Sequence, residues 1–188
     1  MTLDRKRYLE LIEARINNPA SLQKALKKRA RRTVAGKDGK LMLLAADHTA
    51  RGIIAAGNNP TAIADRYILL DKLIRGLAVA GVDGVMASAD ILEELAWLGA
   101  LEEKVAIGTM NRGGIIGASW EIDDRLTAYD AEHIKSMGLD GGKTLLRIDE
   151  TDRLREYSVD PDGVPNPRIL LAPNDSYVVV VTLRPEDS

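Results

Sequence analysis

The middle of the chain alternates short apolar runs with segments in which apolar residues recur every three or four positions. The apolar runs are expected to be strands, at residues 41–46, 82–88, 105–111 and 143–149. The segments between them, at about 61–80, 90–100 and 127–137, have the apolar spacing of helices that bury one side. Strands that alternate with helices over short connections predict βαβ units and a parallel sheet.

Residues that favour helix ends support these boundaries. Asn59 is a suitable N-cap before Pro60, which suits the first helical position, and Gly81 is expected to end the same helix. Asp90 and Glu93 have the spacing of a capping box and are expected to open the following helix. Thr127 and Asp130 are expected to cap the next helix, which Gly138 ends.

Two further helices are predicted before the first strand. In the first, Tyr8, Leu9, Leu11, Ile12 and Ile16 recur at helical spacing. The second, about 21–32, carries Lys24, Lys27, Lys28, Arg29, Arg31 and Arg32. Because no aromatic residues interleave with these cations, the basic positions are interpreted as a solvated helix face rather than a site for RNA or phosphate.

The pattern changes after Asp149. Residues 160–167 are dense in turn-forming residues, and 169–172 and 177–183 then have the composition of two strands of a hairpin. The predicted organisation is therefore a β/α domain over residues 1–150, with an N-terminal helical extension at 1–36, followed by a linker and β tail at 151–188.

Four β/α units of this length predict an α/β fold, specifically a partial TIM-type (β/α)8 barrel. Half a barrel leaves unpaired strand edges and an exposed apolar face. The tail strand, the N-terminal helices or another subunit could cover them, so a homo-oligomer is expected. Val178–Val181 is suited to such pairing.

Composition narrows the functional classes. The chain has 188 residues, 45% of them hydrophobic, with a net charge of −2 and a pI of about 5.8. No nucleic-acid or membrane partner is therefore expected, and the absence of a long apolar segment favours a cytoplasmic protein. The absence of cysteine allows a reducing compartment without requiring one. No Gly-x-Gly-x-x-Gly follows a strand, and there are two histidines, so neither a cofactor nor a metal is expected.

The fourth predicted strand places ionisable residues on one face. Lys143, Leu145, Arg147 and Asp149 alternate with apolar positions, and ionisable groups on an inward face suggest a polar site. A lysine beside a cation in a desolvated interior has a lowered pKa and can act as a nucleophilic amine. Asp47 could move its protons. A structural salt-bridge network through Lys143 and Asp149 is the alternative.

Other polar residues follow the predicted strands, where the carboxyl ends of strands place ligands in α/β folds. The candidate catalytic residues are Asp47 and Lys143. The candidate substrate-binding residues are His48, Arg51, Ser88, Asn111, Arg112, Arg147 and Asp149. A magnesium site through Asp47 and Asp149 remains open as a third, metal-dependent alternative.

The segments Leu41–Gly52 and Lys143–Asp149 resemble the class I aldolase superfamily of (β/α)8 barrels. This superfamily includes deoxyribose-phosphate and tagatose-bisphosphate aldolases, and the closest likeness is to actinobacterial aldolase-like proteins of sugar or myo-inositol catabolism. The resemblance covers about residues 5–150. It implies a lyase that cleaves a carbon–carbon bond in a phosphorylated or keto-deoxy sugar through a Schiff base, with Asp47 and Lys143 beside the substrate.

The chain departs from the superfamily in two places. The superfamily's Schiff-base lysine lies on the sixth strand and its general acid/base on the fifth, and the segment after Asp149 matches neither. Lys143 is therefore the candidate nucleophile. The alternative is an inactive truncated barrel that binds sugar phosphates or forms oligomers without catalysis.

Overall fold

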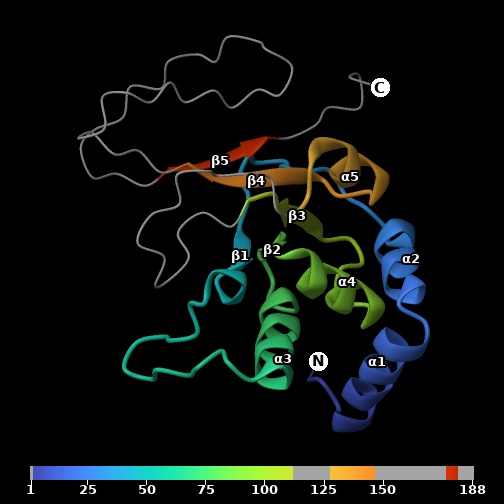
Figure 1. Cartoon of the computed structure of the whole chain (residues 1–188). Helices are drawn as coiled ribbons and strands as arrows, with labels where there is room; N and C mark the ends of the chain where they lie inside the picture. Colours follow the sequence, from blue (N-terminus) through green and yellow to red (C-terminus); the bar gives the residue numbers. More distant parts are fainter. Residues whose placement is uncertain (1, 112–127, 147–176, 182–188) are drawn as a thin grey trace, which may run out of the picture.

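The computed structural model describes residues 2–111, 128–146 and 177–181 (Figure 1). The helices are α1 (Arg5–Asn17), α2 (Ala20–Lys28), α3 (Arg66–Leu77), α4 (Ala89–Trp97) and α5 (Ala131–Ser136), with a 3-10 turn at Thr49–Arg51. The strands are β1 (Leu43–Ala46), β2 (Gly84–Ala87), β3 (Val105–Thr109), β4 (Gly141–Leu146) and β5 (Tyr177–Val181). None of the described helices is both long and apolar enough to cross a membrane.

The strands form one sheet in the order β1-β2-β3-β4-β5. The first four strands pair in parallel, and the expected α/β class with a parallel sheet is confirmed. β5 pairs antiparallel with β4, with Val179 opposite Thr144, so a tail strand covers that edge of the sheet. Residues 169–172, the expected hairpin partner of this strand, lie outside the described residues.

One face of the sheet packs against helices to form the core. The sheet contributes Ala46, Val85, Ala87 and Ala106 to a single cluster with residues of α1 to α5. β3 and α5 approach closely at Gly108, where an added Cβ would lie 2.6–2.8 Å from three side chains. Lys143, Thr109 and Ile107 belong to the opposite face, because side chains alternate along each strand.

Three helices, α3, α4 and α5, begin at residues other than those expected, and α5 starts at Ala131 with Asp130 as its N-cap. α3 begins at Arg66 because Asp65 accepts a hydrogen bond from the Ile68 amide, whereas Asn59 accepts one from Thr61 in a separate turn. α4 begins at Ala89 with Ser88 in the N-cap position. The expected capping box at Asp90 is wrong because the Asp90 carboxylate is engaged by the Ser88 hydroxyl and by Arg66.

The strands also differ in their ends. β1 starts at Leu43 because Leu41 and Met42 are exposed, and the Met42 amide donates to the Asp83 carboxylate. β4 starts at Gly141, two residues before the expected start at Lys143. The packing requires glycine at position 142, because an added Cβ there would clash with the sulfur of Met110.

α2 ends at Lys28, and its basic positions are not all solvated. Arg29 is buried, and its guanidinium contacts the Asp140 carboxylate at 2.5 Å. The same carboxylate accepts hydrogen bonds from Arg31 and from the Ala106 amide of β3. The interpretation of Arg29 as part of a solvated face is therefore wrong, because this residue ties the N-terminal helices to the sheet.

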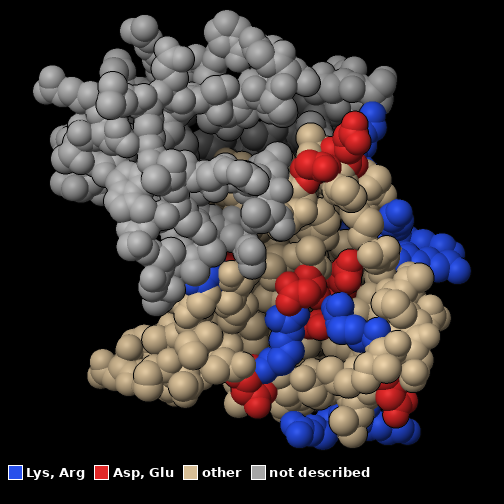
Figure 2. Space-filling view, in the orientation of Figure 1, with Lys and Arg blue, Asp and Glu red and all other residues tan. Residues whose placement is uncertain are grey.

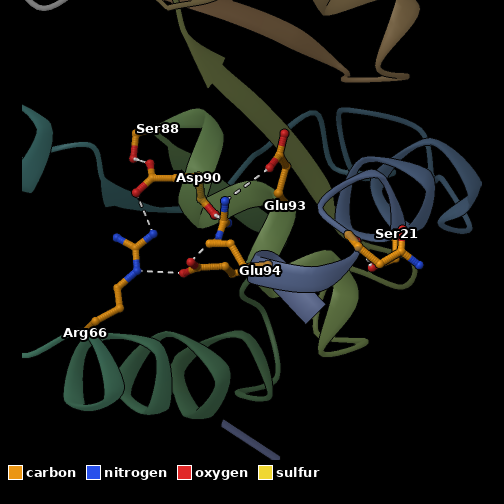
Figure 3. A network of polar contacts seen from close by, with 8 residues as sticks. Ser21, Arg66, Ser88, Asp90, Glu93 and Glu94 are labelled. Atoms are coloured by element: carbon orange, nitrogen blue, oxygen red, sulfur yellow. Dashed lines mark hydrogen bonds and ion pairs between the residues drawn. The ribbon is translucent and has the colours of Figure 1, made fainter. Parts of the chain in front are cut away.

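A second ion-pair network joins α1, α3 and α4 (Figure 3). Arg66 contacts Asp90 at 2.5 Å and Glu94 at 2.6 Å, and Arg15 contacts Glu94 at 3.0 Å. Figure 2 shows acidic and basic side chains lying side by side across this face. α1 buries Leu11 in the apolar core, whereas Leu9 and Ile16 of the expected apolar stripe are 54% and 73% exposed.

Candidate functional site

The centre of the candidate site is an ion pair between Lys143 of β4 and Asp47, which directly follows β1. The Lys143 ammonium donates to the Asp47 carboxylate with an Nζ–Oδ2 distance of 2.6 Å. Both side chains are at most 2% exposed. The two candidate catalytic residues, 96 positions apart in the sequence, are therefore in direct contact.

The electrostatics of Asp47 are set by opposing effects. Burial by itself raises the pKa of this carboxyl, because a charged group loses its solvation. The hydrogen bond from Lys143, followed by the charges of Lys143, Arg51 and His48, outweighs burial and holds the pKa of Asp47 below its ordinary value. Asp47 is therefore an ionised carboxylate at neutral pH.

Arg51 and His48 extend the site beyond the pair. They lie in and next to the 3-10 turn that follows β1, and the turn ends at Gly52 with φ of 75°. Arg51 Nη2 is 3.3 Å from Asp47 Oδ1, and His48 Nδ1 is 3.8 Å from the same oxygen. Lys143 and Arg51 carry two positive charges against the one negative charge of Asp47. These three described residues therefore have a net positive charge, which suits an anionic ligand.

Two other predicted site residues have local partners. Asn111 donates to the Leu145 carbonyl at 2.9 Å and accepts from the Leu145 amide at 2.8 Å, which joins the ends of β3 and β4. The Ser88 hydroxyl donates to Asp90 at 2.5 Å, as Figure 3 shows. Asn111 therefore fixes the strand that carries Lys143, and Ser88 orders the start of α4.

Sequence reasoning missed Thr109, the last residue of β3. It lies opposite Lys143 in the parallel register and is 1% exposed. Among the described residues its hydroxyl has no hydrogen-bond partner. The available signal was its spacing, because Thr109 lies two positions before Asn111 and so shares the same face of the strand.

Three predicted site residues lie outside the described part of the chain. These are Arg112, Arg147 and Asp149. The proposed salt bridge between Lys143 and Asp149 is therefore untested, and the described partner of Lys143 is Asp47. Within residues 2–111, 128–146 and 177–181, no group of three or more His, Asp or Glu side chains is arranged to hold a metal ion.

Comparison with known proteins assigns the chain to a family. A family model described as Cgl0159-like matches residues 39–160, a segment that contains Asp47, Thr109 and Lys143. The chain belongs to the Cgl0159-like family. No curated protein matches it.

A solved structure supports this family assignment. The chain is 43% identical to Cgl0159 from Corynebacterium glutamicum (Brevibacterium flavum), with a TM-score of 0.76. The match covers 80% of this chain and 51% of the C. glutamicum protein. The Cgl0159-like chain therefore spans about half the length of this relative, and the two share their α/β fold over the matched part.

Proposed function

We propose that this protein is an aldolase-type carbon–carbon lyase that acts on a phosphorylated or keto-deoxy sugar through a Schiff base on Lys143. The observation that carries the proposal is the buried contact between Lys143 and Asp47 at the carboxyl end of the parallel sheet. A buried amine beside a carboxylate has both the nucleophile and the proton acceptor that imine formation requires.

We also infer that the four β/α units form half of a (β/α)8 barrel. β1 and β4 are separated by three strand spacings, about 14 Å in a flat sheet. Lys143 nevertheless reaches Asp47 at 2.6 Å, so the sheet curves toward the face that carries this pair. Consecutive parallel strands that curve in this way are consistent with the wall of a barrel whose interior holds the site.

The resting ion pair keeps a proton on Lys143, and the reaction requires the neutral amine. Arg51 is one of the charges that lower the pKa of Asp47. A phosphate or carboxylate on the substrate competes for Arg51 and weakens one of the smaller effects that lower the pKa of Asp47, so the pKa of this carboxyl rises toward its ordinary value. Asp47 can then take the Lys143 proton and release the amine for attack.

The bond changes follow from the amine. The Nζ lone pair forms a bond to the substrate's carbonyl carbon, the nitrogen loses a proton and the carbonyl oxygen gains one. Protonation of the resulting hydroxyl expels water and leaves a protonated imine. The imine withdraws electrons from the bond between the α and β carbons of the substrate. Asp47, once it has given its proton to the departing water, accepts the proton of the β-hydroxyl. The α–β bond then breaks, the β carbon leaves as an aldehyde and the bonding electrons pass into an enamine.

Reductive trapping tests this proposal. In three separate incubations, the protein is mixed with borohydride and one carbonyl compound: dihydroxyacetone phosphate, glyceraldehyde 3-phosphate or pyruvate. The adduct is then mapped by peptide mass. We expect a reduced adduct on Lys143 and none at that position in Lys143→Arg, which keeps the positive charge. Lys104→Met is a matched control, because Lys104 also uses its ammonium in a hydrogen bond, to the Val82 carbonyl at 2.6 Å, but directly precedes β3, at the opposite end of that strand from Thr109.

A second candidate function is anion binding without catalysis. It is favoured by the closed geometry of the pair, in which Asp47 holds the proton on Lys143 and Arg51 supplies positive charge. This function predicts that the same phosphates bind to the folded protein and give no adduct. It also predicts that Arg51→Met weakens their binding. An adduct on Lys143 would exclude it.

A further inference from the structure

Thr109 is a buried residue whose hydroxyl serves no interaction within the described part of the chain. Its side chain is 1% exposed, and among the described residues its hydroxyl has no hydrogen-bond partner. Burying a hydroxyl without a partner costs free energy, and valine would fill the same space without that cost. A strand residue that served packing alone would gain nothing from this hydroxyl.

The position of Thr109 places it beside Lys143 on the same face of the sheet. It is the register partner of Lys143 on the neighbouring strand, and paired residues point to the same face of a sheet. Lys143 of β4 contacts Asp47, which directly follows β1, and β3 lies between these two strands in the sheet order. Thr109 therefore lies next to Lys143, on the same face and on a strand between the two that carry the ion pair.

Within the described part of the chain, neighbouring polar groups have hydrogen-bond partners and the Thr109 hydroxyl has none. The Asn111 amide is bonded to both backbone groups of Leu145, and the Ser88 hydroxyl is bonded to Asp90. Of the described hydroxyl and amide side chains at the carboxyl ends of β2 and β3, Thr109 thus retains a free donor and acceptor.

We propose that the Thr109 hydroxyl binds the oxygen of the carbonyl group that Lys143 attacks. This inference rests on the proposed function. As nitrogen bonds to carbon, negative charge develops on that oxygen, and a hydrogen bond donated by Thr109 strengthens as it does so. Thr109 thereby also selects substrates whose carbonyl oxygen reaches the floor of the site while their anionic group contacts Arg51.

Two substitutions at this position separate a contact with substrate from a packing role. Thr109→Val keeps the shape and removes the hydroxyl, whereas Thr109→Ser keeps the hydroxyl and removes a methyl group. The rate of borohydride-trapped adduct formation on Lys143 is measured with dihydroxyacetone phosphate as the probe, beside thermal unfolding of each variant. Removing one such donor is expected to slow trapping about 100-fold in Thr109→Val.

The outcomes are distinguishable. We expect Thr109→Ser to restore the trapping rate, while Thr109→Val unfolds at the wild-type temperature or above because it buries no unpaired hydroxyl. Equal trapping rates in wild type and Thr109→Val would overturn this inference and leave the proposed function standing, as would equal slowing in both variants. Wild-type protein that forms no adduct on Lys143 would overturn the proposed function and this inference with it.

Discussion

At the scale of single residues, the site depends on a buried charge that has one strong partner. Lys143 and Asp47 are both nearly inaccessible to water, and Asp47 also accepts a hydrogen bond from Arg51 at 3.3 Å. Removing one member of a buried ion pair leaves the other charge desolvated without compensation. The pair therefore couples the stability of the fold to the chemistry proposed for it.

A double-mutant cycle measures this coupling. Asp47→Asn and Lys143→Met are each expected to lower the free energy of unfolding by about 3–5 kcal/mol, because each strands the opposite charge. The double variant removes both charges and is expected to lose less than the sum. Urea unfolding monitored by circular dichroism gives the three values, and strictly additive losses would contradict a direct contact.

Stability should also depend on pH through Asp47. Its pKa in the folded protein lies below the ordinary value of about 3.9, so the unfolded chain binds more protons in the interval between the two pKa values. The stabilisation is complete above the unfolded pKa and is lost as pH falls through the folded pKa. Between about pH 6 and pH 3, wild type should lose more unfolding free energy than Asp47→Asn; parallel curves would refute this.

At the scale of elements, close approach of β3 to α5 is set by glycine. A Cβ on Gly108 would lie 2.6–2.8 Å from the buried side chains of Tyr129, Ile134 and Leu139. Gly76 in α3 differs, because its Cβ would come within 3 Å of one atom only, the terminal Cδ1 of the half-buried Leu44. Leu44 also lines an open groove of about 270 Å³, which gives its methyl group room to move.

Alanine substitution at these two glycines should have opposite consequences. Gly108→Ala is expected to lower the unfolding free energy by about 1–3 kcal/mol through overpacking. Gly76→Ala is expected to be neutral or to stabilise by up to about 1 kcal/mol, since alanine favours a helix more than glycine does. Denaturant midpoints give both values, and a larger loss of unfolding free energy in Gly76→Ala than in Gly108→Ala would contradict these expectations.

The sequence predicted the described strands and the alternation of strands and helices because apolar periodicity encodes them directly. It misplaced helix starts, since Asp65 and Asn59 are equally good caps and only tertiary structure selects between them. Arg29 was misread because its partner, Asp140, is 111 positions away. Lys143 was found from strand alternation, whereas the pairing with Asp47 and the unpartnered Thr109 required the register of the whole sheet.

At the scale of the whole molecule, the described sheet has two edge strands, β1 and β5. Among the described strands, β1 pairs only with β2 and β5 only with β4. Leu41 and Met42, just before β1, are 38% and 58% exposed. Exposed apolar residues next to a strand edge favour association with another chain, and the homo-oligomer stays a prediction.

Sedimentation equilibrium tests that expectation. Wild type is expected to show a mass above that of one 20.5 kDa chain that rises with concentration, and Met42→Lys to weaken the association by placing a charge beside the edge. Ile16→Lys is the control, because Ile16 is 73% exposed on α1, away from β1 in Figure 1. Loss of association in both variants would indicate that the chains associate through a different surface. A monomeric wild type would contradict the predicted homo-oligomer.

The central claim is that Lys143 activates a carbonyl substrate rather than only binding an anion. An imine on Lys143 acidifies the neighbouring carbon, so that its proton is exchanged with solvent. Proton NMR of dihydroxyacetone phosphate in heavy water measures this exchange. We predict deuterium next to the carbonyl carbon with wild type and with Lys104→Met, and none with Lys143→Arg. Folded wild-type protein that catalyses no exchange on any of the three carbonyl probes would contradict the account.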